Sequence, residues 1–429
     1  MMNLMQRLAS APGSVIVDKQ VKALKVIASE ARELAEHIAS RGRVLVWTDS
    51  VEELIRVITA ATSVQADVFV AHRSISAQRI NELVSPLRIN QLFRSGILET
   101  YDSFESGGSG FLYVMTSGTT QFPKIAKHTA DTLFGTIKQT AGSSLARWLL
   151  TYPPTSFAGL QVTFSALIGG GNLVAPPQRT MSSFVEAAVT QRVTHISGTP
   201  TFWRSFLCLL PQESAALHLE QVTIGGEAVD QSTLDRLRAA LPCARITQIY
   251  ASTEAGVAFS VNDVKAGIPV EWFDGEIGGV QLKVVDDVLH IRSPRILQRY
   301  ESGEASPFDA EGWLCTGDLV RKEQDRFVFA GRADGRFNIG GFKVSPEEVE
   351  SVLLQCEGVA DVLVLAEASP ISGQVLVANV VPYNGRSVGE LKKSVQRFAY
   401  ERLEPFKIPR IIRIVKGIEA AESGKKVRL

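Results

Sequence analysis

A hydroxyl-rich segment with one lysine follows the apolar run at 111–115. It reads Thr116-Ser117-Gly118-Thr119-Thr120-Gln121-Phe122-Pro123-Lys124. Hydroxyls, main-chain amides of a tight loop and an ammonium group are donors that hold nucleotide phosphates. Pro123 stands where a Walker loop requires glycine, and no Ser or Thr follows Lys124, so this is a different kind of loop. The alternative interpretation is an ordinary solvated Ser/Thr loop.

The residues after Lys124 predict a hairpin. Ile125 to His128 has the length and composition of a second short strand, and Thr129 is a residue type that begins helices. We therefore expect the phosphates to be held by a hairpin loop and not by a helix N-terminus.

Further polar segments punctuate the rest of the chain. One of them follows an expected strand and offers an aromatic face, two hydroxyls and a carboxylate, and another presents an acidic residue in an expected tight turn. The segments are Tyr250-Ala251-Ser252-Thr253-Glu254, Trp313-Leu314-Cys315-Thr316-Gly317-Asp318, Gly331-Arg332-Ala333-Asp334 and Glu422-Ser423-Gly424-Lys425-Lys426-Val427-Arg428.

Strands and helices alternate from residue 15 to about 330, which predicts largely parallel sheets covered by helices. Ligands then bind at loops leaving the carboxyl ends of strands, where the segments after Met115 and Tyr250 both lie. The expected strands are 43–47, 67–70, 148–150, 172–174, 194–196, 221–224 and 245–250, and the expected helices are 19–40, 52–61, 160–167, 202–210 and 232–241.

The pattern changes after about residue 275. The segments 280–285 and 288–292 predict an antiparallel hairpin that turns at Asp286-Asp287. A compact α+β tail follows Gly331-Arg332-Ala333-Asp334-Gly335, with a helix that begins at Ser345 as N-cap and Pro346. We therefore expect two domains, 1–331 and 332–429, joined by a hinge at the glycine-containing segment.

Composition narrows the function classes. The chain has 429 residues, 45% of them hydrophobic, and 45 basic residues balance 45 acidic ones. A net charge near zero gives no long-range attraction to nucleic acid or anionic membranes. The four scattered cysteines argue against a zinc site or a disulfide framework and favour a reducing, cytoplasmic location. No signal peptide and no membrane span is expected.

The five polar segments, taken in order, resemble those of the adenylate-forming superfamily of acyl-CoA synthetases, nonribosomal-peptide adenylation domains and luciferases. The resemblance covers the chain from about Phe111 to its end, and it is closest to a short stand-alone acyl- or aryl-acid ligase. It implies an α/β fold: a large N-terminal domain of parallel and mixed sheets covered by helices, with a shortened first subdomain, and a small mobile C-terminal α+β domain.

The resemblance also implies roles for individual residues. The phosphate-loop residues hold the β- and γ-phosphates of ATP, Tyr250 stacks on adenine, Thr253 binds the α-phosphate and Glu254 coordinates Mg²⁺. Asp318 takes the ribose hydroxyls, Arg332 lies beside them, Asp334 is the hinge residue and Lys425 bridges the attacking carboxylate and the α-phosphate. The remaining implied nucleotide contacts are Thr116, Ser117, Gly118, Thr119, Thr120, Lys124, Gly225, Gly226, Glu227, Ala251, Ser252 and Lys343.

The implied chemistry explains why cations are needed. A carboxylate is a poor electrophile and is repelled by the polyphosphate that it must attack, so Mg²⁺ and Lys425 neutralise both anions. Rotation of the small domain then withdraws Lys425 and admits a thiol, either coenzyme A or the phosphopantetheine of a carrier protein.

Three positions depart from the family pattern. Gln121 and Ile125 stand where the family's phosphate loop has glycine, so the loop is expected to be stiffer or differently shaped. Asn338 stands where many members carry lysine. Gln121 and Ile125 keep open the alternative of a nucleotide-binding module with weakened catalysis.

The acyl pocket is expected at Tyr152 to Leu160, where relatives supply a gating histidine or aromatic residue. This segment contains no histidine, and Ser156 or Phe157 would take that place. Amino-acid-activating relatives have an aspartate where this chain has Ala158. Because an unpaired buried ammonium is costly, we expect an aryl or acyl acid as the substrate and not an α-amino acid.

Three functions follow from these observations. The leading one is ATP-dependent acid activation followed by transfer to coenzyme A, and its close variant loads a carrier protein. Gly340-Gly341-Phe342 matches the segment that lines the thiol tunnel and does not separate the two thiols. The alternative from another class is a nucleotide-binding pseudoenzyme, and a luciferase-type activity is a remote third.

Overall fold

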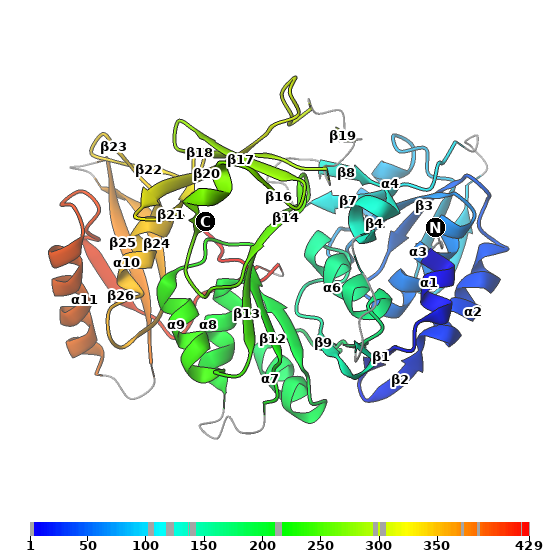
Figure 1. The fold of residues 1–429 in the computed structure, drawn as a ribbon, viewed down its shortest axis with the longest axis horizontal. Helices are drawn as coiled ribbons and strands as arrows, with labels where there is room; N and C mark the ends of the chain where they lie inside the picture. Colours follow the sequence, from blue (N-terminus) through cyan, green and yellow to red (C-terminus); the bar gives the residue numbers. More distant parts are fainter. Residues whose placement is uncertain are drawn as a thin grey trace. The chain divides into compact units, whose positions relative to one another are not determined.

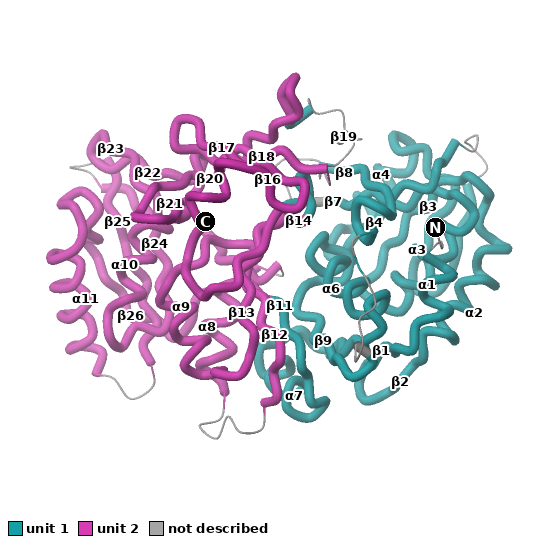
Figure 2. Tube along the Cα trace, viewed as in Figure 1, with its two compact units in different colours: residues 1–197, 252–256, 295–307 teal, residues 198–251, 257–294, 308–429 magenta. Residues whose placement is uncertain are grey.

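The computed structural model describes residues 4–101, 107–116, 124–135, 137, 143–210, 217–294, 299–300, 306–369, 373–383, 387–421 and 423–428. The chain divides into two compact units (Figure 2). Unit 1 comprises residues 1–197, 252–256 and 295–307, and unit 2 comprises 198–251, 257–294 and 308–429. Ser117 to Pro123 of the phosphate-loop segment lie outside the described residues, and so does Glu422.

In unit 1 the described residues form a seven-stranded sheet in the order β19-β8-β7-β4-β3-β5-β6 (Figure 1). The central strands β7, β4, β3 and β5 are parallel, whereas β8, β19 and β6 join antiparallel. The strands are β3 (Arg43–Trp47), β4 (Asp67–Ala71), β5 (Gln91–Arg94), β6 (Ile97–Thr100), β7 (Leu112–Thr116), β8 (Lys124–His128) and β19 (Arg299–Tyr300). The predicted hairpin after residue 111 is thus present as β7 and β8.

A second group of strands in unit 1 runs in the order β11-β9-β10-β1-β2. These strands are β1 (Ser14–Val17), β2 (Gln20–Ala23), β9 (Arg147–Leu149), β10 (Asn172–Val174) and β11 (His195–Gly198). The helices of unit 1 are α1 (Leu4–Ser10), α2 (Leu24–Ala35), α3 (Val51–Ser63), α4 (Ala77–Val84), α5 (Ala130–Phe134), α6 (Phe157–Ile168) and α7 (Met181–Thr190), with a 3₁₀ turn η1 at Ser143–Leu145.

Helical spacing of apolar residues explains how these helices cover the seven-stranded sheet. In α3, Leu54, Ile55 and Ile58 are fully buried, and they share one core with α1, α2 and α6. Ile80 and Leu83 of α4 belong to a different cluster with strand residues of the other face. The sheet is therefore packed on both faces, as a largely parallel sheet requires.

The helix predicted over 19–40 is wrong at its start. Asp18 and Lys19 have positive φ angles of 45° and 67°, and they form the turn between β1 and β2. The helix α2 begins only at Leu24 and ends at Ala35. The apolar spacing that predicts a helix thus extends beyond both ends of α2, and at its start the chain forms a two-residue hairpin turn instead.

In unit 2, parallel strands β12 and β13 precede a six-stranded antiparallel sheet in the order β15-β21-β20-β18-β17-β16, counted over the described residues. Helices α8 (Pro200–Leu209) and α9 (Gln231–Ala240) flank β12, and a 3₁₀ turn η3 spans Val270–Phe273. The strands are β12 (Gln221–Gly225), β13 (Arg245–Ser252, whose last residue belongs to unit 1), β14 (Gly256–Val261, whose first residue belongs to unit 1), β15 (Ile268–Pro269), β16 (Glu276–Ile277), β17 (Val280–Val285), β18 (Val288–Arg292), β20 (Leu314–Glu323) and β21 (Arg326–Arg332).

The hairpin predicted at 280–292 is confirmed with its turn. Strands β17 and β18 pair antiparallel, with Val285 opposite Val288. Asp286 and Asp287 have φ angles of 50° and 62°, the left-handed conformation that two-residue hairpin turns demand.

The last part of unit 2 has its own apolar core. Helices α10 (Pro346–Leu353) and α11 (Val388–Arg402) pack on a sheet of β24 (Val359–Ser369), β25 (Gly373–Pro382) and β26 (Ile411–Ile414), after a small hairpin of β22 (Phe337–Ile339) and β23 (Phe342–Val344). Ser345 is the N-cap of α10 and Pro346 opens the helix, as predicted, although the Ser345 side chain makes no capping hydrogen bond. The domain boundary at 331 and 332 stays a prediction.

A search of the described residues for a helix that could cross a membrane finds none of sufficient length and apolarity.

Gly225 marks a close approach between β12 and β13 that predicts a stability effect. A Cβ on Gly225 would lie 2.3 Å from the carbonyl oxygen of Ile249. Because that obstacle is backbone, we expect Gly225→Ala to lower the free energy of unfolding by about 1–3 kcal/mol. The urea-unfolding midpoint measures the effect.

Gly389→Ala provides the matched control, because nothing lies within 4 Å of a Cβ at this position in α11. We expect it to raise the free energy of unfolding by about 0.5–1 kcal/mol. Equal midpoints for the two variants would contradict the close approach.

Candidate functional site

A polar cluster joins Tyr250 at the end of β13 to two strands of the antiparallel sheet in unit 2. The Tyr250 hydroxyl donates to Oδ2 of Asp318 at 2.5 Å, and Nη1 of Arg332 donates to Oδ1 at 3.2 Å. Asp318 and Arg332 lie directly opposite each other on β20 and β21. Three residues that the sequence predicts to serve the nucleotide are therefore in contact.

Asp318 lies inside β20 and not in a tight turn, so that expectation is wrong. The signal that suggested a turn is Gly317, which has a φ of 73° within the strand. The Thr316 hydroxyl accepts a hydrogen bond from the Asp318 amide, which holds the backbone from which the Asp318 side chain extends. A glycine at this point avoids a side chain that would press on the Arg332 guanidinium, 3.0 Å from the Cβ position.

The electrostatics of Asp318 combine burial with several charged neighbours. Burial raises the pKa of Asp318, while the Tyr250 hydrogen bond and the positive charges of Arg332 and Lys425 act against the rise without cancelling it. Burial and the Asp318 charge also raise the pKa of Tyr250 well above its ordinary value, so Tyr250 stays a hydrogen-bond donor. The Asp318 side chain keeps 21% of its surface exposed, which leaves the carboxylate accessible to a ligand.

The Tyr250 ring packs parallel to Phe259 and Phe329, with centroid distances of 5.2 and 5.6 Å. Its stacking on adenine stays a prediction.

Lys425 lies beside Gly226 at the end of β12. Its ε-carbon is 3.9 Å from the position of a Cβ on Gly226, which has a φ of 83°, and the lysine is exposed. The Thr199 hydroxyl donates to the carbonyl oxygen of Gly424 at 2.5 Å. Two segments that are more than two hundred residues apart in the sequence are thereby joined next to the predicted catalytic lysine.

Glu227 is predicted to contact the nucleotide, and in the structure its carboxylate has two main-chain contacts. Its carboxylate accepts from the amide of Thr201 at 3.1 Å and from the amide of Lys426 at 2.9 Å. Glu227 thus connects the first turn of α8 with the C-terminal segment. Neither of these contacts could be inferred from the Gly-Gly-Glu pattern.

The other predicted residues of unit 2 lie just after β21, on β23 and within β13. Asp334 accepts from Nε of Arg332 at 2.9 Å, in a pair whose side chains are 52% and 73% exposed. Lys343 is exposed on β23 opposite Asn338. Ala251 is partly exposed within β13.

Two of the predicted catalytic residues of unit 1 directly follow β13, and the third begins β8. Thr253 and Glu254 form a turn that Ser252 stabilises, because its hydroxyl accepts from the amide of Ala255 at 3.0 Å. Lys124 is the first residue of β8 and pairs with Thr116, the last residue of β7. The residues between Thr116 and Lys124 that would complete this part of the site are outside the described residues.

A buried histidine that the sequence analysis missed contacts both the acyl-pocket segment and this turn. His128 ends β8 with none of its surface exposed, and its ring centroid is 5.9 Å from that of Phe157. Burial lowers the pKa of His128 to about 4, against opposing effects of the Thr253 main chain and Glu254, so the imidazole is neutral at neutral pH. Within the described residues its ring nitrogens have no hydrogen-bond partner of normal geometry.

The predicted acyl-pocket residues lie at the start of α6. Ser156 is the N-cap: its hydroxyl accepts from the amide of Gly159 and donates to the carbonyl oxygen of Pro153. Phe157 and Ala158 are half-buried and pack against the main core of unit 1. Ser156 therefore caps helix α6, and its role in the acyl pocket stays a prediction.

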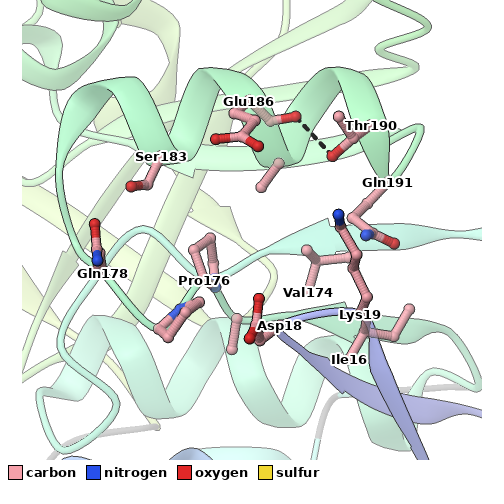
Figure 3. Close-up of a pocket in the computed structure, with 13 residues that line it drawn as sticks. Ile16, Asp18, Lys19, Val174, Pro176, Gln178, Ser183, Glu186, Thr190 and Gln191 are labelled. Atoms are coloured by element: carbon pink, nitrogen blue, oxygen red, sulfur yellow. Dashed lines mark hydrogen bonds between the residues drawn. The ribbon is translucent and has the colours of Figure 1, made fainter.

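Unit 1 also contains an open hollow, which is lined by a different set of residues (Figure 3). Asp18 and Lys19 of the β1–β2 turn face Glu186 of α7 and Gln191, the residue after α7, across it. Since none of the predicted site residues lines this hollow, it is not the candidate site.

The fold is that of adenylate-forming enzymes. The anthranilate CoA ligase AuaEII, solved with anthranoyl-AMP, matches at a TM-score of 0.81 over 99% of this chain and 94% of its own, with 18% identity. A benzoate CoA ligase from Burkholderia xenovorans LB400 matches at 0.79 over 99% of both chains, with 20% identity. These likenesses establish the fold.

Two family models match the chain: the AMP-binding enzyme model at residues 111–295 and the AMP-binding enzyme C-terminal domain model at 348–425. The chain belongs to the AMP-binding enzyme family. The predicted resemblance is thereby confirmed.

Curated relatives include acid–AMP and acid–CoA ligases. The p-hydroxybenzoic acid–AMP ligase FadD22 of Mycobacterium tuberculosis is 30% identical over 353 residues, which is 75% of this chain and 48% of the relative. The 4-coumarate–CoA ligase 2 of Oryza sativa is 28% identical over 291 residues, 62% of this chain and 50% of the relative. The chain spans about half the length of these curated relatives.

The charge state of Asp318 predicts a pH dependence of nucleotide binding. Because burial raises its pKa, the carboxylate takes up a proton at a higher pH than an ordinary aspartate does when the solution is acidified. We expect the affinity for AMP, measured by calorimetry, to fall with that protonation. In Asp318→Asn the affinity should be lower throughout and lose this dependence.

Tyr250→Phe sharpens the test. The Tyr250 hydrogen bond lowers the pKa of Asp318, so its removal should move the fall in AMP affinity to a higher pH. An unchanged profile in this variant would contradict the coupling of the two residues.

Proposed function

We propose that this protein activates a carboxylic acid by ATP-dependent adenylation, with release of pyrophosphate, and then transfers the acyl group to a thiol. The observation that carries the proposal is the placement of Lys425. It lies beside Gly226 on a segment that Thr199 and Glu227 hold, and its charge acts on Asp318. A lysine of the C-terminal segment beside nucleotide-motif residues is the arrangement that the family resemblance implies for adenylation.

The chain's own residues fit the nucleotide. Asp318 is a partly exposed carboxylate fixed by Tyr250 and Arg332, and it is suited to accept from two ribose hydroxyls. Gly226 leaves the main chain open at a positive φ, where a flat base can approach. Ser117, Thr119, Thr120 and Lys124 are proposed to hold the leaving pyrophosphate.

Magnesium is proposed to bind Glu254, because hard cations prefer carboxylate and phosphate oxygens. When bound, the ion supplies positive charge that offsets the phosphates. The remaining neutralisation falls to Lys425, whose ammonium pairs with the incoming carboxylate and the α-phosphate. Thr253, next to Glu254, is proposed to donate to the α-phosphate and fix its orientation.

An aryl or acyl carboxylic acid is the proposed substrate. The segment at the start of α6 offers Phe157 and Ala158 and no carboxylate to pair with an α-ammonium group. The neutral imidazole of His128 behind Phe157 adds to this uncharged surrounding. The names of the relatives, which act on p-hydroxybenzoate and 4-coumarate, support an aryl acid.

Coenzyme A is the proposed thiol, with the phosphopantetheine arm of a carrier protein as the variant. Several relatives are named CoA ligases, whereas FadD22 is named an acid–AMP ligase. Parallel assays of thioester formation with free coenzyme A and with a loaded carrier protein separate the two.

A nucleotide-binding protein without catalysis is the second candidate, favoured by Gln121 and Ile125 at family glycine positions. Ile125 of β8 is buried in the same apolar cluster as Ile80 and Leu83, so an apolar side chain at that position contributes to core packing. Binding of ATP without pyrophosphate release for any acid would support this candidate.

The acid-dependence of the reaction is the direct test. We expect pyrophosphate release with ATP and Mg²⁺ to require an acid from a panel of aryl, medium-chain and amino acids, with aryl or acyl acids active. Release with amino acids alone would overturn the proposed substrate class.

Lys425→Ala should abolish adenylate formation while affecting thioester formation from a supplied acyl-adenylate much less. The reason is that the ammonium is needed only while two anions are brought together. Stopped assays of each half-reaction measure the split. An equal loss in both would contradict a lysine that acts in the first step alone.

A further inference from the structure

A chain of buried charges in unit 2 connects helix α8 with the C-terminal segment. Nε of Arg204 lies 2.7 Å from Oδ1 of Asp361, and Nζ of Lys426 lies 3.1 Å from the same oxygen. The three side chains are 4%, 9% and 3% exposed. A buried charge costs free energy unless it is paired, so loss of any one of these three side chains would leave a partner's charge buried and less well compensated.

Each member of this charge chain has further partners. Arg204 also contacts Asp230 at 3.2 Å and donates to Thr201 and Thr233. Lys426 pairs with Glu350 at 3.1 Å and donates to the carbonyl oxygen of Val362. Burial favours the neutral form of Asp361, but Arg204 and Lys426 outweigh it and lower its pKa, so the carboxylate is charged at neutral pH.

The two ends of the charge chain lie in or next to stretches that two different family models match. Arg204 belongs to the stretch matched by the AMP-binding enzyme model, whereas Asp361 lies within the stretch matched by the C-terminal domain model and Lys426 directly follows it. Asp361 therefore pairs with a cation from each side of the expected domain boundary.

Lys425 and Lys426 are adjacent and have opposite environments. The segment around them is extended, since Lys426 forms a bridge with Ala420 and the amide of Val427 donates to Glu419. Successive side chains of an extended segment point to opposite sides. Lys426 enters the buried charges, and Lys425 is consequently turned to the exposed side, where Gly226 lies.

A slip of one residue would exchange the two lysines, because either could supply an ammonium group. The buried anions remove this ambiguity. Lys426 reaches both Asp361 and Glu350, the second of which also pairs with Arg428, while Glu227 accepts from the Lys426 amide and Thr199 donates to Gly424.

We propose that the Arg204–Asp361–Lys426 charge chain is a positioning device that sets the register of the C-terminal segment and so presents Lys425 for adenylate formation. The inference rests on the proposed function. In this arrangement Lys426 contacts neither nucleotide nor acid, and it acts through the residue before it. Separation of the two domain parts would require breaking the contact between Arg204 and Asp361.

Lys426→Met tests the proposal, since it keeps the length of the side chain and removes its charge. We expect adenylate formation to fall by about 10²-fold, the cost of a displacement of roughly 1 Å in a reacting group. Thioester formation from a supplied acyl-adenylate should be unchanged or faster. Lys426→Arg, which retains the charge, should recover much of the first half-reaction.

Arg413→Met is the matched control. Arg413 pairs with Glu367 in the same C-terminal part, and the two side chains are 45% and 39% exposed. Loss of an exposed pair costs little, so both half-reactions should match those of the unaltered protein.

Hydrogen exchange gives a readout that does not depend on catalysis. The Lys426 amide is held by Glu227, so the C-terminal peptide should exchange faster in Lys426→Met than in Arg413→Met. Equal loss in both half-reactions, or an unaltered exchange rate with an unaltered adenylation rate, would overturn the positioning role. Absence of acid-dependent pyrophosphate release in the unaltered protein would instead overturn the proposed function.

Discussion

The hold of two short segments on the C-terminal residues is the interaction on which the rest of the site depends. Thr199 binds the carbonyl of Gly424, and Glu227 binds the amide of Lys426, so the main chain on both sides of Lys425 is fixed. The same Thr199 is the N-cap of α8, and the same Glu227 accepts from the first turn of that helix. The lysine and the nucleotide-motif residues thus share one set of hydrogen bonds.

The positions of Lys425 and Lys426 are therefore linked to the charges around them. In the proposed function Lys425 serves two anions and must stay solvated, whereas its neighbour must stay buried to hold the register. The structure meets both needs with adjacent residues of the same type, Lys425 exposed and Lys426 enclosed by Asp361 and Glu350. Buried ion pairs contribute little net stability, so their value here lies in specifying one arrangement among several.

The sequence predicted the regular elements well where local signals agree. The strands at 43–47 and 172–174 and the hairpin at 280–292 have the predicted bounds, because strand composition and turn residues coincide there. The helix predicted from 19 failed because Asp18 and Lys19 adopt left-handed conformations that their residue types only weakly signal. Asp318 was expected in a turn, since a glycine inside a long strand resembles a turn in sequence.

The candidate site was less accessible to sequence reasoning. Tyr250, Asp318 and Arg332 could be named from their motifs, and the structure brings them together. His128 could not, because a histidine at a strand end carries no sign that Phe157 will pack against it. Asp361 and Arg204 lie 157 residues apart, and no local pattern reveals a pairing of that range.

Transfer of oxygen from the acid to the nucleotide tests the central claim most directly. With a carboxylic acid labelled by ¹⁸O in both carboxylate oxygens, attack on the α-phosphate followed by thiol transfer leaves one labelled oxygen in AMP. Mass spectrometry of the AMP formed in a single turnover reads this out. We expect AMP that carries one ¹⁸O atom per acyl group transferred, and unlabelled AMP, or label in inorganic phosphate, would contradict acid activation at the α-phosphate.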